Sequence, residues 1–329
     1  MNLRPFYFVV VVLGAQYRDY FLEYCLPSLL SPNNIPVLAG RRPAKLLMAT
    51  TAEDWEIMRA TAIFRELEKH AKPVFIELPP KGDTPYWYHS IIGHKLCCDM
   101  VARDKAYRLL ACPDTVFSDG AVEVYHRAAL DGAQAVLTFV SHLTRTDKFF
   151  QALAEMGLRP EKSARDTGVP IVLPPRNVAA LAIRAMHGLS RGNEWDWQNF
   201  CGYASTPWWQ VPGEEGIVAC GMRWDLMLVD YAAIPHDGAI LDQRGFDGDY
   251  IMRTIGGLDT IYTVRDSDEM YVVSWASLPE PEFPRQRHGD FGKGIGFRAS
   301  AHGAEFNAMQ RALLFVPTYV HSGPPNEKW

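Results

Sequence analysis

The stretch Phe6-Tyr-Phe-Val-Val-Val-Val-Leu13 decides the fold expected of this chain. Eight consecutive apolar residues leave no side that could face water, which is typical of a strand covered on both faces in a parallel sheet. Arg4 before the run and Gly14 after it also fit a signal peptide. However, the run is β-branched and aromatic, and it is far shorter than the ~20 residues of a membrane span. We therefore predict a buried strand followed by its helix.

Apolar segments alternate with amphipathic ones on the C-terminal side of this run. Helices are predicted at residues 18–30, 90–103 and 119–130, and Thr50 with Glu53 has the capping-box spacing of a further helix start. This order gives β-α-β units with right-handed crossovers, so the expected fold class is α/β with a mostly parallel, nucleotide-binding sheet. Further strands are predicted at residues 45–50, 73–78, 107–112 and 133–140.

The second half of the chain has a different pattern. Residues 158–176 are polar and contain prolines, which predicts a boundary. We expect residues 1–157 to form the nucleotide-binding α/β domain. Residues 158–329 are expected to form a tryptophan-rich α+β portion, with a helix at 176–189 and a last helix near 301–314.

Composition narrows the class of protein. The chain has 329 residues, of which 48% are hydrophobic and 22% charged, as in ordinary globular proteins. Its net charge of −5 and scattered basic residues offer no surface for nucleic acid, which we do not expect as a partner. The six cysteines include no C-x-x-C pair, which favours a reducing, cytoplasmic location. We expect no transmembrane segment.

The exit of the strand at 107–112 carries the most informative acids. Asp114 follows that strand by two residues, and Asp119 precedes the next helix. Ligands bind beyond the carboxyl ends of parallel strands, and a carboxylate there suits Mg²⁺ or Mn²⁺ bridging phosphate oxygens. The alternatives are that Asp114 shapes a turn and that Ser118 or Asp119 caps the helix.

The sequence resembles the GT-A-type glycosyltransferases that use nucleoside-diphosphate sugars. The resemblance covers about 140 residues and rests on the order of elements, with "VVVVLGAQYRDYFLEYCLPSLL" at 9–30 and "YRLLACPDTVFSDGAVEVYHRAALDGAQAVL" at 107–137. In that family an Asp-x-Asp motif after strand four binds the metal and the diphosphate. Here Cys112 takes the place of the first Asp and Asp114 that of the second, which implies Asp114 as the ligand of Mn²⁺ or Mg²⁺. The family's acid-rich end of strand two is replaced by Ala49-Thr50-Thr51.

Other residues are candidates for the nucleotide site. The resemblance implies that Gly14 and Tyr17 approach the nucleobase. His94 and Lys95 precede strand four, where a cation or a hydrogen-bond donor would face a diphosphate, although a solvated helix face also explains them.

A basic, glycine-rich segment at 285–294 is a candidate loop over the diphosphate. His288 or Lys293 would neutralise the leaving group there, and a solvated surface loop is the alternative.

Neither G-x-G-x-x-G nor a P-loop is present, which disfavours dinucleotide-binding enzymes and ATPases.

Five of the nine tryptophans fall within residues 192–224, among glycines and prolines. Flat rings bury the apolar face of a sugar, so Trp208 and Trp209 are candidates for substrate binding, with core packing of this portion as the alternative. The other three of this group are Trp195, Trp197 and Trp224.

A carboxylate of the second half is the expected general base toward an acceptor hydroxyl. Asp249 is the first candidate and Asp247 the substitute, both in an Asp-Gly-Asp sequence that would equally form a tight turn. Glu214 and Glu215 are further candidates beside the tryptophans.

These features together favour a glycosyltransferase that moves a sugar from a nucleoside-diphosphate sugar to a carbohydrate or other hydroxyl acceptor. A non-catalytic nucleotide-sugar-binding or scaffold protein would explain Cys112 in the motif. A sugar nucleotidyltransferase would need a Gly- and Lys-rich signature after the first strand, which the sequence does not contain.

Overall fold

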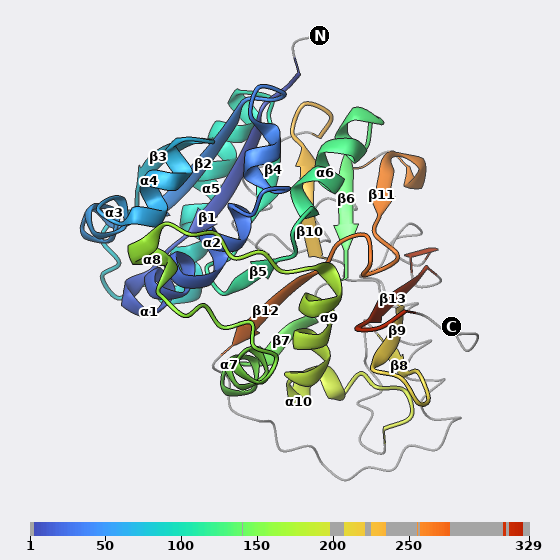
Figure 1. Cartoon of the computed structure of the whole chain (residues 1–329). Coiled ribbons are helices and arrows are strands. Elements are labelled where there is room, and N and C mark those ends of the chain that lie inside the picture. Colours follow the sequence, from blue (N-terminus) through green and yellow to red (C-terminus); the bar gives the residue numbers. More distant parts are fainter. Residues whose placement is uncertain are drawn as a thin grey trace. The chain divides into compact units, whose positions relative to one another are not determined.

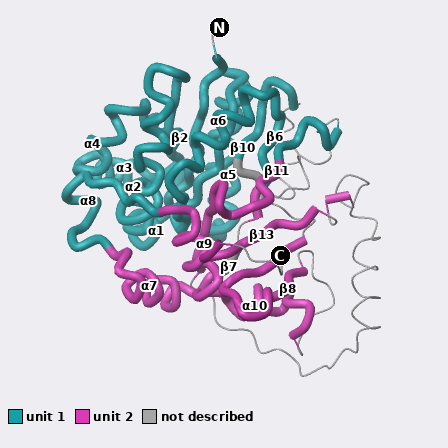
Figure 2. The backbone as a smooth tube through the Cα atoms, turned by 45° about the vertical axis from the view of Figure 1, so that its right-hand side comes forward, with its two compact units in different colours: residues 1–137, 160–173, 226–262 teal, residues 138–159, 174–225, 263–329 magenta. Residues whose placement is uncertain are grey.

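The structure of the chain is a computed structural model (Figure 1). The structure describes residues 3–139, 141–197, 207–220, 225–234, 255, 257–276, 312–313 and 316–324. Two compact units are distinguished in Figure 2. Unit 1 comprises Met1–Leu137, Pro160–Leu173 and Leu226–Tyr262, and unit 2 comprises Thr138–Arg159, Pro174–Asp225 and Thr263–Trp329. No described helix is both long and apolar enough to cross a membrane.

Unit 1 is built around a seven-stranded sheet with the order β11-β6-β10-β4-β1-β2-β3. The pairs β1–β2, β2–β3 and β1–β4 are parallel, and β10 is antiparallel to β4. The predicted class, a mixed α/β fold with a large, mostly parallel sheet, is confirmed. The strands are β1 (Phe6–Val11), β2 (Ala44–Thr50), β3 (Lys72–Glu77), β4 (Tyr107–Leu110), β6 (Ala135–Thr138), β10 (Asp225–Asp230) and β11 (Ile261–Thr263).

The helices of unit 1 follow the predicted order, with shifted ends. The helix expected at 18–30 begins earlier and has a π-helical middle, as α1 (Gly14–Tyr20), η1 (Phe21–Cys25) and α2 (Leu26–Leu29). The helix expected at 90–103 begins four residues earlier, as α5 (Tyr86–Arg103). The remaining elements are η2 (Ile35–Leu38), α3 (Ala52–Arg59), α4 (Ala62–Glu68), β5 (Thr115–Phe117), α6 (Ala121–Leu130), α8 (Ala164–Thr167) and η3 (Leu258–Thr260).

The N-cap predicted at Thr50 is wrong, and the N-cap of α6 also differs from the alternative that the sequence left open. The N-cap of α3 is Thr51, whose hydroxyl accepts the Asp54 N–H at 3.1 Å, because Thr50 is the buried last residue of β2. At α6 the N-cap position is occupied by Gly120 rather than by Ser118 or Asp119.

A side chain that is distant in the sequence accepts a backbone N–H group at the start of α6. The buried Asn34 accepts the Val122 N–H at 2.9 Å through its Oδ1 atom. The Asp119 carboxylate instead accepts the backbone and side-chain N–H groups of Asn33, at 3.0 and 2.7 Å. Both contacts tie the segment before η2 to the start of α6.

Strand β10 is an element that sequence reasoning missed. It lies between β4 and β6, where the predicted β-α-β order would put β6 beside β4. The Asp230 carboxylate at its end pairs with Arg4, whose Nη2 atom donates to Oδ2 at 2.6 Å. The same Nη2 donates to the Tyr107 hydroxyl at 2.7 Å, so Arg4 joins β10 to the start of β4.

Unit 2 contains shorter sheets and three helices among its described residues. Strand β7 (Ser141–Arg145) pairs in parallel with β12 (Val272–Ala276), and β9 (Gly216–Cys220) is antiparallel to both β8 (Trp208–Gln210) and β13 (Pro317–His321). The helices are α7 (Thr146–Glu155), α9 (Pro175–Arg184) and α10 (Gly188–Arg191). The single helix expected at 176–189 is therefore two helices. The last helix expected at 301–314 lies almost wholly outside the described residues.

Helix α5 packs closely on the sheet at Gly93. A Cβ atom at this position would lie 2.9 Å from Val11 Cγ1 and 3.1 Å from Ala49 Cβ. The absence of a side chain at Gly93 therefore sets the distance of the helix from the ends of β1 and β2. This matters for function because the N-terminal half of α5 borders the pocket described below.

Gly93→Leu is predicted to lower the free energy of unfolding by about 2–3 kcal/mol, because β-branched Val11 cannot yield to the added side chain. Urea unfolding measures the change. Asp99→Leu, at an exposed position of the same helix, is the control and should stay within about 0.5 kcal/mol of the native chain. Equal stability of the two variants would contradict the close contact.

Candidate functional site

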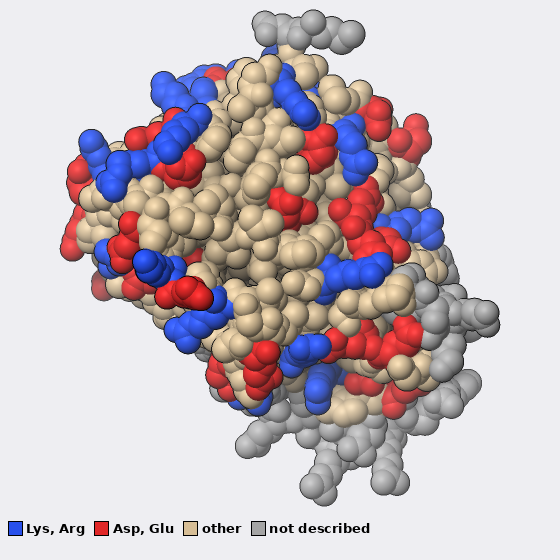
Figure 3. Space-filling model, in the orientation of Figure 1, with Lys and Arg blue, Asp and Glu red and all other residues tan. Residues whose placement is uncertain are grey.

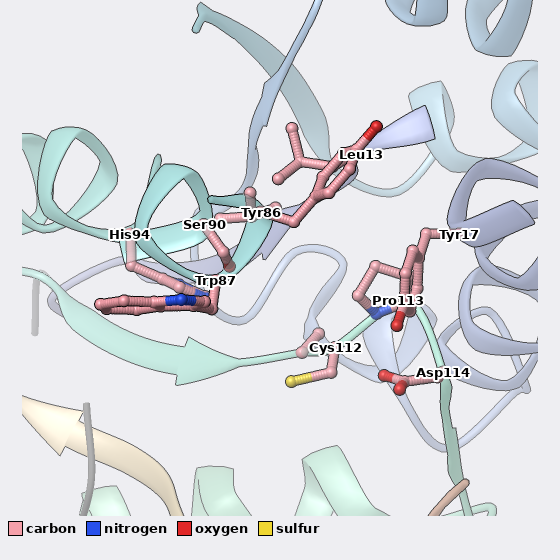
Figure 4. Close-up of a pocket in the computed structure, with 11 residues that line it drawn as sticks. Leu13, Tyr17, Tyr86, Trp87, Ser90, His94, Cys112, Pro113 and Asp114 are labelled. Carbon is pink, nitrogen blue, oxygen red and sulfur yellow. The ribbon is translucent and has the colours of Figure 1, made fainter. Parts of the chain in front are cut away.

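A pocket of about 480 Å³ lies in unit 1 at the carboxyl ends of β1 and β4 (Figure 4). This is the edge at which open parallel sheets bind ligands. On the face drawn in Figure 3, basic and acidic side chains are intermingled, so this face shows no large patch of one charge that would indicate a different binding site. The lining residues are Val11, Leu13, Tyr17, Tyr86, Trp87, Ser90, His94, Ala111, Cys112, Pro113 and Asp114.

Three of the predicted site residues meet in this pocket. Tyr17 comes from α1, His94 from α5, and Asp114 from the turn after β4. Figure 4 shows the Tyr17 hydroxyl pointing toward the Asp114 carboxylate. Burial, and then the negative charge of Asp114, raise the pKa of Tyr17, so its phenol is a protonated hydrogen-bond donor at neutral pH.

Gly14 and Lys95 lie beside the lining rather than in it. The Gly14 N–H donates to Asp54 Oδ2 at 3.3 Å, and Arg18 Nη1 donates to Asp54 Oδ1 at 2.7 Å. Gly14 has a φ of +79°, a conformation that favours glycine. These contacts fix the start of α1, which carries Tyr17. Lys95 follows His94 on α5 and does not line the pocket.

His94 is a neutral group in this pocket. Burial, and then the positive charge of Arg108, lower the pKa of His94 to about 3. Its Nδ1 atom is shielded from solvent although part of the residue remains exposed. At neutral pH the imidazole therefore carries no charge toward a diphosphate. Of the two predicted roles, only the hydrogen-bonding one fits this protonation state.

Sequence reasoning missed the aromatic rim of the pocket. Tyr86 and Trp87, at the first turn of α5, are 64% and 67% exposed although they are large and apolar. The Lys81 ammonium lies 4.7 Å from the centre of the Tyr86 ring. The signal was present as three consecutive aromatic residues after Pro85. Exposed rings beside a pocket indicate a surface for a flat ligand.

The predicted tryptophans lie in unit 2. Trp208 is buried and its Nε1–H donates to the Ser190 carbonyl at 2.8 Å. The Trp209 and Trp195 rings are stacked, with their centres 5.6 Å apart. These contacts are those of side chains packed within unit 2, the alternative that the sequence left open.

Of the candidate bases, Glu214 and Glu215 lie in the described residues. The Glu215 carboxylate accepts from Arg184 Nε at 2.5 Å and from the Ser322 hydroxyl at 2.6 Å. The hydrogen bond from Arg184 is the main cause that lowers the pKa of Glu215, which makes it a weaker base. Glu214 forms the turn between β8 and β9, where its carbonyl accepts from Gln210 at 3.0 Å. Asp247, Asp249, His288, Lys293 and Trp224 lie outside the described residues.

Two places offer ligand atoms for a metal ion. Among the described residues that line the pocket, Asp114 supplies the one carboxylate, and it lies beside the Cys112 thiol. Among the described residues, one group of three has the spacing that could hold a metal ion, and its ligand atoms lie within 4.8 Å of one another. This group consists of Asp266, Asp268 and His321 in unit 2.

No protein-family model matches the sequence, and neither does any curated protein. Similar solved structures include mouse xyloside xylosyltransferase 1 in its apo form, at 13% identity and a TM-score of 0.28, with 48% of this chain and 63% of that chain covered. Another is a putative glucose-1-phosphate thymidylyltransferase from Bacillus anthracis in complex with a sucrose, at 11% identity and a TM-score of 0.28, with 43% and 58% covered. The match thus spans less than two thirds of either structure. Because these identities and TM-scores are low, neither comparison assigns a family or an activity to this chain.

The neutral state of His94 predicts a pH dependence. Unfolded chains bind a proton at histidine near pH 6.5, whereas the native pKa of His94 is about 3. The stability that native His94 contributes is therefore complete above about pH 6.5 and is lost as the pH falls toward 3. Relative to His94→Gln, the native chain should lose up to about 1.4 kcal/mol of unfolding free energy per pH unit below that value.

Urea unfolding between about pH 7 and pH 5 measures this difference. Nuclear magnetic resonance of the His94 ring gives an independent reading, because its signal should not titrate in that range. A His94 signal that titrates near pH 6.5 would contradict the buried, neutral state.

Proposed function

We propose that the chain is a GT-A-type glycosyltransferase and that the pocket holds its nucleoside-diphosphate-sugar donor. The observation that carries the proposal is the meeting of Tyr17, His94 and Asp114, from three separate segments, around one pocket at the carboxyl edge of the sheet. The volume of about 480 Å³ is in the range of small-molecule sites.

The lining suits the neutral parts of such a donor. The rings of Tyr17, Tyr86 and Trp87 offer faces for a nucleobase, since base–aromatic stacking contributes ~1–3 kcal/mol. The Asp114 carboxylate accepts hydrogen bonds from ribose or sugar hydroxyls, and the Tyr17 phenol donates them. A few polar groups in a largely apolar pocket give orientation and specificity.

The charged part of the donor needs a positive partner. Helix α5 begins at Tyr86, so the positive end of its dipole lies at the pocket and favours negative charge. Within the described lining, Asp114 would be the protein ligand of Mg²⁺ or Mn²⁺, with the phosphates supplying other oxygens, because the Cys112 thiol is too soft a ligand for these ions. When bound, the ion supplies charge stabilisation to the departing diphosphate.

The same proposal gives functional roles to other segments of the chain. Residues 1–157 bind the donor, and residues 158–329 form the acceptor-binding portion. Asp249, with Asp247 as substitute, is the base that removes the proton from the acceptor hydroxyl during displacement at the anomeric carbon. Lys95, His288 and Lys293 are proposed to act on the diphosphate, as donors or neutralising groups.

One observation favours a second candidate, a non-catalytic protein that binds nucleotide sugars. Cys112 stands where the resemblance expects the first acid, and the residues that line the pocket include no Lys or Arg. Such a pocket would hold a nucleotide sugar without stabilising a leaving diphosphate.

Calorimetric titration with UDP-, GDP- and CMP-sugars, with and without Mn²⁺, tests the proposal. Trp87→Ala should weaken binding of the preferred donor about tenfold, or ~1.4 kcal/mol, through the lost stacking. Asp114→Asn should remove the part of the affinity that depends on Mn²⁺. Leu130→Ala is the control, because Leu130 is a 53% exposed apolar residue at the end of α6 and does not line the pocket.

Mass spectrometry of the products separates the two candidates. Release of free nucleoside diphosphate together with a glycosylated acceptor supports the transferase, whereas tight binding with an intact donor supports the binding protein. Failure of every nucleotide sugar to bind, or an unchanged affinity in both Trp87→Ala and Asp114→Asn, would overturn the assignment of the pocket.

A further inference from the structure

A second cluster, in unit 2, joins the end of β13 to the turn before β12. Asp266 and Asp268 belong to that turn, and His321 is the last residue of β13. The turn is held against the strand by hydrogen bonds, with the Ser267 N–H donating to the Tyr319 carbonyl at 2.8 Å and the His321 N–H to the Ser267 hydroxyl at 3.0 Å. The three side chains are thus placed by paired backbone rather than by a free loop.

The environment of His321 defines the roles of its two ring nitrogens. The side chain is 1% exposed. Its Nδ1 atom lies 2.5 Å from the Gly323 carbonyl oxygen, and because a carbonyl only accepts, Nδ1 carries the proton of that hydrogen bond. Its Nε2 atom lies 2.9 Å from Asp266 Oδ1. The Nε2 atom of a buried ring therefore faces a carboxylate oxygen whose side chain is 45% exposed, and a positive species between the two atoms would stabilise this arrangement.

The geometry suits a metal ion as that positive species. Two ligands at about 2.1 Å from an ion and at right angles to each other lie about 3 Å apart, which is close to the Nε2–Oδ1 separation. Asp268 supplies a third ligand atom, and all three lie within 4.8 Å of one another. The Nδ1–H bond to a backbone carbonyl is the contact that orients metal-binding histidines.

Asp268 is itself oriented by a neighbour. Arg176 donates to both of its carboxylate oxygens, Nε to Oδ1 and Nη2 to Oδ2, each at 2.7 Å. This two-point contact fixes the plane of the carboxylate. The same two hydrogen bonds lower the pKa of Asp268.

We propose that Asp266, Asp268 and His321 bind one divalent transition-metal ion, with Mn²⁺ or Zn²⁺ as the fitting ions. Two carboxylates and one imidazole combine the ligand types that these ions accept, whereas Mg²⁺ and Ca²⁺ favour oxygen alone. The site goes beyond the proposed function, because none of its residues lines the donor pocket. The bound ion fastens the turn before β12 to the end of β13.

The test uses the full chain, freed of metal by a chelator and then titrated with Mn²⁺ in the absence of nucleotide. Mn²⁺ is the better probe because the part-exposed thiols of Cys112 and Cys220 would compete for Zn²⁺. We expect one Mn²⁺ per chain, with pulsed electron paramagnetic resonance showing coupling to an imidazole nitrogen. His321→Gln should lose that coupling and bind Mn²⁺ at least tenfold more weakly, about the loss seen when a metal site is disturbed.

Two control variants distinguish this site from others. Asp114→Asn alters the donor pocket and should leave the nitrogen coupling unchanged, so this proposal and the proposed function fail separately. His70→Gln alters a surface His–Glu pair, in which Nε2 lies 3.3 Å from Glu66, and should also leave it unchanged.

Two results would overturn the site. One is a native chain without nitrogen-coupled Mn²⁺, which needs no variant to fold. The other is an unchanged Mn²⁺ affinity in folded His321→Gln and Asp266→Asn, verified by circular dichroism. In either case the positive species between His321 and Asp266 is a proton, and the cluster is a hydrogen-bond network.

Discussion

Burial of β1 on all sides is the constraint on which the rest of unit 1 depends. All six residues of the strand are buried, so its backbone groups have no water and must be paired within the sheet. Strands β2 and β4 supply these partners, with Phe6 in register with Ala44 on one side and Tyr107 on the other. Because both neighbours are parallel to β1, the three strands end at the same edge, and the pocket lies there.

Helix α5 both packs on the sheet and supplies side chains to the pocket. Its middle approaches the sheet at Gly93, and Asp104 at its C-terminal cap accepts the Tyr7 hydroxyl at 2.6 Å. That hydrogen bond is the main cause that lowers the pKa of Asp104 to about 2, with Arg103 and Lys45 adding to it. The helix is thus held at Gly93 and at its C-terminal end, and these two residues position Trp87 and His94 although neither Gly93 nor Asp104 lines the pocket.

The two candidate sites differ in the number of charged side chains among their described residues. The described lining of the pocket has one carboxylate and a neutral His94, so it offers a ligand aromatic rings, hydrogen-bonding groups and the positive end of the α5 dipole. The cluster in unit 2 gathers two carboxylates, of which Arg176 neutralises one. In this cluster the Nε2 atom of the buried His321 ring faces the half-exposed Asp266 carboxylate at 2.9 Å, so the cluster offers ligand atoms for a cation.

The sequence by itself determined the mostly parallel sheet, the positions of β1 to β4 along the chain and the carboxyl edge at which a ligand is expected, because apolar runs and their periodicity are local features of a sequence. Only the tertiary structure decided the insertion of β10, the capping of α6 by Asn34 from 88 residues away, the aromatic rim at Tyr86 and Trp87, and the grouping of Asp266 with His321. These features depend on hydrogen bonds and packing between distant segments, which a local pattern does not encode.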